Sequence, residues 1–132
     1  MGLNKMAYQF QKHYTREEVR ALLPQAREWL ARAAELRTEL DKLERRLGGM
    51  MAAGCDLGGE LVNTWVKTLA RLDAVLSEFQ RREIQVKDID RGLLDFPALL
   101  GEKEVFLCWE QDEEDVEFWH DLDAGYAGRE HL

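Results

Sequence analysis

Apolar residues recur every three or four positions over the first two thirds of the chain, which is the period of amphipathic α-helices. Between residues 15 and 48 the spacing alternates between four and three, through Leu22, Ala26, Trp29, Ala33, Leu36, Leu40, Leu43 and Leu47. A second series between residues 60 and 83 has similar spacing and contains Val62, Trp65, Leu69, Leu72, Leu76 and Phe79. Two consecutive seams of this kind predict a long antiparallel, coiled-coil-like helical hairpin.

The sequence also indicates where the first helix begins and ends. Thr15 and Glu18 have the spacing of a capping box at its start. A glycine-rich segment, residues 48–59, predicts a loop between the two helices. Pro24 removes one helical hydrogen bond, so the helix either kinks there or stops and restarts. The apolar spacing stays in phase across Pro24, which favours a kink.

The last third of the chain, residues 85–132, changes to the pattern of short β-strands. Two apolar runs, residues 104–109 and 116–120, flank an acidic turn and predict a β-hairpin. Extra apolar residues at the open end of the helical hairpin give such a sheet a surface on which to pack. The predicted fold is therefore one α+β domain over residues 1–132, with a helical hairpin over residues 14–84 and a small antiparallel sheet at its open end.

The register of the predicted β-hairpin decides which side chains meet. A turn centred in the middle of the acidic segment places Val105 opposite His120 and Cys108 opposite Glu117. Successive residues of a strand point to opposite faces of a sheet. Cys108 and His120 are therefore predicted to lie on different faces.

Composition and charge exclude several classes of protein. No apolar run approaches the roughly 18 residues of a membrane span, and the first residues lack the apolar core of a signal peptide. With only two cysteines, a reducing cytoplasmic location is expected. The net charge is −8, and residues 104–128 hold nine acids and no Lys or Arg. Such a patch repels phosphate backbones, so no nucleic-acid partner is expected.

Several short motifs carry a family resemblance. They are YTREEVRALLP at 14–24, VKD at 86–88, GLLDFP at 92–97, LCW at 107–109, WH at 119–120 and DAGYAGR at 123–129. Together they resemble a small bacterial family catalogued as a domain of unknown function, family 2203. The resemblance covers nearly the whole chain and implies a bacterial or archaeal cytoplasmic protein. It brings no activity, cofactor or catalytic residue. The chain departs from the family by having Asp112-Glu113 in place of Gly-Glu in the hairpin turn, which leaves the turn type open.

Six residues of the last third are candidate ligands of a metal ion or small molecule: Asp95, Cys108, Glu117, His120, Asp123 and Arg129. Carboxylate, thiolate and imidazole groups are the donors of zinc-type sites. The predicted register nevertheless separates Cys108 from His120, which favours a buried structural cysteine and a hydrogen-bonded structural histidine. No cofactor is predicted, and a divalent metal is the alternative. Arg129 is expected to pair with a nearby acid rather than to clamp an anion.

The expected function is that of a non-enzymatic interaction or scaffold module that forms a homodimer through its helices. A two-helix hairpin leaves its seam partly exposed, and a four-helix bundle of two copies covers it. The predicted interface consists of Leu36, Leu40, Leu43, Leu47, Val62, Trp65 and Leu69. The alternative is a metal- or small-molecule-dependent enzyme whose site lies between the sheet and the base of the helices.

Overall fold

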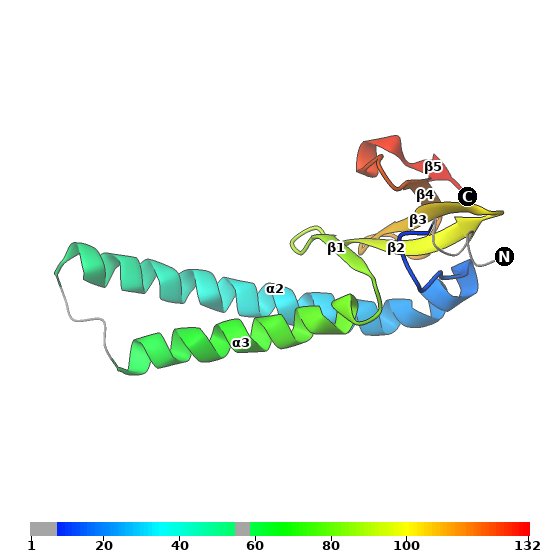
Figure 1. Ribbon diagram of the computed structural model, residues 1–132. Coiled ribbons are helices and arrows are strands. Elements are labelled where there is room, and N and C mark those ends of the chain that lie inside the picture. The colour runs from blue at the N-terminus through cyan, green and yellow to red at the C-terminus, as the bar shows by residue number, and fades with distance from the viewer. Residues whose placement is uncertain (1–7, 55–58) are drawn as a thin grey trace.

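The protein consists of two long helices followed by a small sheet. The structure is a computed structural model and describes residues 8–54 and 59–132. The helices form an antiparallel hairpin, and a five-stranded antiparallel sheet lies at its open end (Figure 1). The elements are α2 (Arg16–Ala52), α3 (Glu60–Gln80), β1 (Gln85–Asp88), β2 (Leu93–Leu100), β3 (Lys103–Glu110), β4 (Phe118–Asp121), the 3-10 helix η1 (Tyr126–Gly128) and β5 (Glu130–His131). The strands lie in the sheet in their order along the chain. The predicted α+β fold is confirmed.

The start of α2 is fixed by its capping residues. The Thr15 hydroxyl accepts a hydrogen bond from the Glu18 backbone N–H at 3.1 Å, and the Glu18 carboxylate accepts one from the Thr15 N–H at 2.9 Å. Tyr14 and Val19, on either side of this box, are buried in the same apolar cluster. From there α2 runs for 37 residues and passes through Pro24 without a break.

The end of α2 differs from the prediction. Gly48 and Gly49 were expected to begin the loop, but the helix continues to Ala52, so the first part of the predicted loop is helical. Both glycines are exposed, and an exposed glycine in a helix costs only about 1 kcal/mol. The hydrogen bonds of the preceding turns offset that cost. The rest of the predicted loop includes residues 55–58, which lie outside the described residues.

One face of the sheet packs on the base of the helical hairpin. Alternate residues of β2 and β3 supply this face, and they are Leu94, Phe96, Ala98, Val105, Leu107 and Trp109. They meet Val19, Leu23, Leu30 and Phe79 of the helices in one buried cluster. Burying a large apolar side chain contributes about 1.5–3 kcal/mol, so this cluster holds the two layers together.

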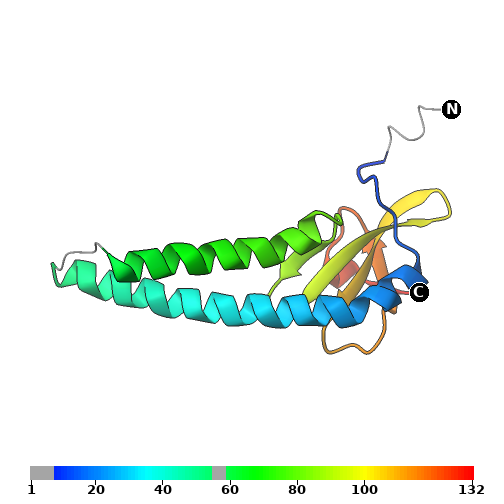
Figure 2. The same ribbon diagram turned by 90° about the horizontal axis from the view of Figure 1, so that it is seen from below.

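Beyond the sheet, the two helices continue as an arm (Figures 1 and 2). A second buried cluster inside the arm contains Ala33, Leu36, Leu40 and Leu72. Neither described helix combines the length and the apolar character that crossing a membrane requires.

The register of β3 and β4 corrects the predicted β-hairpin by one residue. His120 pairs with Phe106 rather than with Val105, and Cys108 pairs with Phe118 rather than with Glu117. A shift of one residue moves every side chain of a strand to the other face. His120 therefore lies on the same face of the sheet as Cys108.

The cause of the shift is the connection between these strands, which is longer than a tight turn. Residues 111–117 separate β3 from β4. Arg27 of α2 donates hydrogen bonds to the backbone carbonyls of Gln111 and Glu113, and the Trp109 indole N–H donates to the Glu113 carbonyl at 3.0 Å. Because these contacts hold the loop against α2, Val116 enters the core and β4 begins only at Phe118.

Replacing Thr15 with alanine removes the side-chain half of the cap. We expect the free energy of unfolding to fall by about 1 kcal/mol, measured by urea denaturation. Thr38→Ala is the matched control, because the exposed Thr38 hydroxyl only donates to the Ala34 carbonyl within α2. Its effect should stay within about 0.5 kcal/mol. Equal effects of the two substitutions would show that the capping box does not stabilise the helix.

Candidate metal centre

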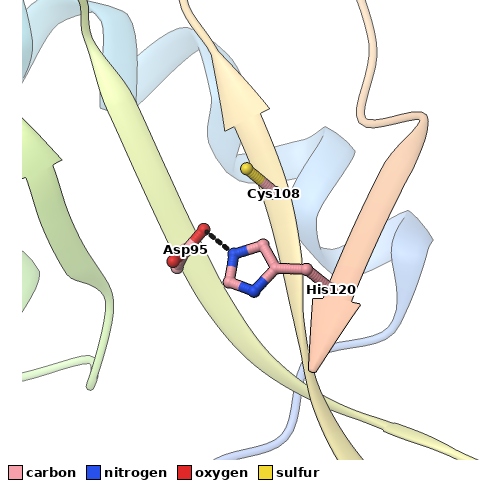
Figure 3. A group of neighbouring side chains, drawn as sticks. All are labelled: Asp95, Cys108 and His120. Atoms are coloured by element: carbon pink, nitrogen blue, oxygen red, sulfur yellow. Dashed lines mark hydrogen bonds and ion pairs between the residues drawn. The ribbon is translucent and has the colours of Figure 1, made fainter. Parts of the chain in front are cut away.

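Three side chains from neighbouring strands meet on the face of the sheet that points away from the helices (Figure 3). Asp95 of β2 pairs directly with Cys108 of β3, and His120 of β4 pairs with Phe106, two residues before Cys108. The alternation that sends Leu94 and Phe96 into the core sends Asp95 to the opposite face. All three are nearly inaccessible to solvent, with 2%, 0% and 2% of their surfaces exposed for Asp95, Cys108 and His120.

The orientation of His120 is fixed by a hydrogen bond on each ring nitrogen. Nδ1 lies 2.7 Å from the backbone carbonyl of Asp121, and Nε2 lies 3.0 Å from Oδ1 of Asp95. A carbonyl oxygen only accepts, so Nδ1 must donate. In a neutral imidazole Nε2 then has a lone pair, which faces the Asp95 carboxyl group. Without a metal ion, one proton must lie between Nε2 and Asp95 to make their contact attractive.

Cys108 completes the cluster as a neutral thiol. Burial, reinforced by the negative charge of Asp95, raises the pKa of the Cys108 thiol to about 12, against the opposing effect of the Arg129 charge. At neutral pH the sulfur is therefore protonated and is a poor nucleophile. Nucleophilic catalysis by Cys108 is disfavoured in the absence of a metal.

The three residues form a donor set of the kind that binds zinc. Their donor atoms, one carboxylate oxygen, one thiol sulfur and one imidazole nitrogen, all lie within 4.8 Å of one another. A tetrahedral zinc ion brings such atoms to about 3.5 Å from one another, which requires a small inward movement. Metal-binding histidines typically donate their second ring N–H to a carbonyl or carboxylate, and His120 already does so.

The structure brings together three of the six residues that the sequence suggested. Glu117 and Asp123 are exposed and do not belong to the cluster. Arg129 forms an ion pair with Glu113 at 2.6 Å, and its guanidinium group lies 3.9 Å from the centre of the Phe118 ring. The cluster lies on the outer face of the sheet, and the alternative site predicted between the sheet and the base of the helices stays a prediction.

Sequence reasoning missed two residues near the cluster. Glu113 was considered only as part of a hairpin turn, and Phe118 only as part of the apolar run 116–120. The structure makes Glu113 the partner of Arg129 and Phe118 the neighbour of Cys108 on β4. Only the density of acids before Arg129 hinted at such a pair, and it did not indicate which acid takes part.

The fold and the cluster together define an α+β protein with a helical arm and a buried Asp–Cys–His site on the outer face of its sheet. The chain belongs to the family of uncharacterised conserved proteins DUF2203, whose model matches residues 12–132. The resemblance seen in the sequence motifs is thereby confirmed. Comparison with curated proteins and with solved structures gives no significant match.

The burial of Cys108 predicts a very slow reaction with disulfide reagents. In a Cys55→Ser background Cys108 is the only thiol of the chain. A rise of the pKa from 9.0 to about 12 lowers the thiolate fraction roughly 1000-fold near neutral pH. We expect the folded protein to react at least about 100-fold more slowly than the urea-unfolded chain. Equal rates in the two states would contradict the buried position of Cys108.

Proposed function

We propose that the protein binds one divalent transition-metal ion, with Zn²⁺ as the preferred ion, through Asp95, Cys108 and His120. The observation that carries the proposal is the orientation of His120. Its Nδ1 is bound to the Asp121 carbonyl at 2.7 Å, so its other nitrogen, Nε2, faces the point on which Asp95 and Cys108 converge. The correct tautomer and direction of a metal ligand are thus set by the backbone.

The charges and chemistry of the three groups support this choice of ion. A thiolate and a carboxylate together neutralise the two charges of a divalent ion, which lowers the cost of burying it. The thiolate favours the softer transition metals over Mg²⁺ or Ca²⁺. Three protein ligands leave a fourth position, which in zinc proteins is taken by water or a small ligand. Because all three ligands are buried, the geometry suits an ion that is retained rather than one that exchanges rapidly with solvent.

Titration with Co²⁺ tests this proposal, because a bound thiolate gives cobalt a charge-transfer absorption band. We expect one ion per chain, displaced by Zn²⁺. Cys108→Ser and His120→Ala should each weaken binding by at least about 100-fold. Glu117→Gln and Asp123→Asn are matched controls on neighbouring acids outside the cluster, and they should leave the affinity unchanged. Equal affinity of the first two variants and the wild-type protein would refute the proposal.

The affinity for the metal should rise with pH, for a reason that follows from the raised pKa of Cys108. The thiol is protonated below a pH of about 12, and the metal must displace this proton. Each displaced proton makes the apparent affinity about tenfold higher per pH unit. Between about pH 6 and 9 we therefore expect a slope of at least one logarithmic unit per pH unit, measured by competition with a chelator of known affinity. A flat profile would show that the sulfur is not a ligand.

We propose a second role, homodimerisation, for the helical arm. Val62, Val66 and Leu69 follow one another on α3 at spacings of four and three residues, as in a heptad seam. Val66 and Leu69 are 51% and 42% exposed, whereas Leu72, on the side that faces α2, is buried. An apolar seam that is exposed in one copy is covered when two arms associate into a four-helix bundle.

The residues of the predicted interface have different positions in the arm. Leu36 and Leu40 are buried within the helical hairpin of a single chain, so substitutions there damage the hairpin itself. Leu43, Leu47, Val62 and Trp65 are partly exposed, and Leu69 is exposed. Leu69 is therefore the sharper position at which to test dimerisation.

We expect sedimentation equilibrium to show a species of twice the chain mass of 15.4 kDa at high micromolar concentration. Leu69→Asp should dissociate it, because it places a charge on the exposed seam. Leu99→Asp is a matched control, because Leu99 is similarly exposed, at 39%, but lies in β2. A wild-type protein that remains at 15.4 kDa at every concentration would disprove dimerisation through the arm.

A further inference from the structure

The C-terminal segment, residues 122–132, lies against part of the outer face of the sheet, next to the cluster of Asp95, Cys108 and His120. Its Arg129 side chain is only 9% exposed and is stacked between two rings, with the guanidinium carbon 3.9 Å from the centre of Phe118 and 4.5 Å from that of Tyr126. Phe118 pairs with Cys108 across β3 and β4 and therefore shares its face. The segment thus lies next to β4 (Figure 1), with Arg129 on the face of the sheet that carries Cys108.

Side chains hold the segment in place. Arg129 donates two hydrogen bonds from Nη2 to the Glu113 carboxylate, at 2.6 and 2.8 Å. The other ring neighbour of Arg129, Tyr126, also contacts the guanidinium group of Arg91, whose carbon lies 4.4 Å from the ring centre. Arg91 is in turn paired with Glu110 of β3 at 2.9 Å. These contacts form a ladder of alternating cations and rings that binds the segment to the sheet.

The backbone attachment of the segment is short. β5 contains two residues and pairs only with β4, at the edge of the sheet. Because β5 is the edge strand, the segment can lift away without parting any other strands. Entry of an ion between β2, β3 and β4 would instead break the backbone hydrogen bonds that join these central strands.

The N-terminal segment, residues 8–13, lies on the side of the cluster that carries His120, and several hydrogen bonds hold it there. Phe10 packs against Phe106, whose ring lies next to His120 with centres 5.6 Å apart. Two carboxylates, of Glu104 and Glu83, fix this segment. Glu104 accepts hydrogen bonds from the backbone N–H groups of Gln9 and Phe10 and bonds the His13 ring, and Glu83 accepts from the N–H groups of Gln11 and Lys12.

We propose that the C-terminal segment is the gate through which the metal ion enters and leaves the cluster, with the Arg129–Glu113 ion pair and the stacked Tyr126 ring as its fastenings. This inference rests on the proposed metal binding. Since the ligands are nearly inaccessible, an ion reaches them only when a covering segment opens. Local opening of the least stable segment is the usual route to a buried site.

Stopped-flow mixing of the full chain with Co²⁺, and of the loaded chain with excess chelator, tests the gate. Tyr126→Ala removes the stacked ring without changing the charge near the cluster, and Glu113→Gln removes the ion pair. Each should raise both the association and the dissociation rate by about tenfold. The dissociation constant should stay within about twofold, because opening of the gate affects both directions equally. Glu104→Gln, which loosens the N-terminal segment, is the control and should leave both rates unchanged.

The outcomes separate the two proposals. If the wild-type chain binds no Co²⁺, metal binding itself is wrong. If it binds Co²⁺ but both gate variants keep the wild-type rates, or change only the dissociation constant, metal binding stands and the gate is wrong. Faster exchange in Glu104→Gln alone would place the entrance at the N-terminal segment and would also overturn the inference.

Discussion

The structure depends on the packing of one face of the sheet against the base of the helical hairpin. Trp109, Leu107 and Phe96 fill the contact with the base of the helical hairpin, and the strands cannot slip without exposing them. Because side chains alternate along a strand, this packing also sets what the other face must carry. Asp95 and Cys108 are sent outward on paired positions, and the same register brings His120 beside them. The packing of the apolar core therefore fixes the register that brings Asp95, Cys108 and His120 together on the outer face.

The elements with strong local signals could be predicted from the sequence. The apolar seams of the helices extend over many turns, so an error at one position leaves the assignment unchanged. The capping box depends on two residues three positions apart, Thr15 and Glu18, and needs no tertiary contact. The end of α2 was missed because the hydrogen bonds of the preceding turns offset the modest cost of Gly48 and Gly49.

The candidate site was predicted in its residue types but not in its arrangement. Asp95, Cys108 and His120 were all named as possible ligands, yet the predicted register put Cys108 and His120 on opposite faces. The loop that sets the true register is held by Arg27, which lies more than 80 residues before it in the sequence. No pattern within the β-hairpin itself encodes that contact. An error of one residue there reverses the conclusion about the site, because it moves His120 to the other face.

The proposal of a metal ion rests on an unusual feature of the outer face of the sheet. In a two-layer fold this face is normally left to solvent and carries polar side chains at no great cost. Here residues 8–13 and 122–132 lie against it, and a carboxyl, an imidazole and a thiol on this face are buried. Without an ion, the shared proton of Asp95 and His120 and the neutral Cys108 thiol keep that burial tolerable. An ion that replaced these protons would satisfy all three groups at once and would join β2, β3 and β4. In the proposed scheme the fold forms before the metal binds, and metal binding would then add stability to a site that is already in place.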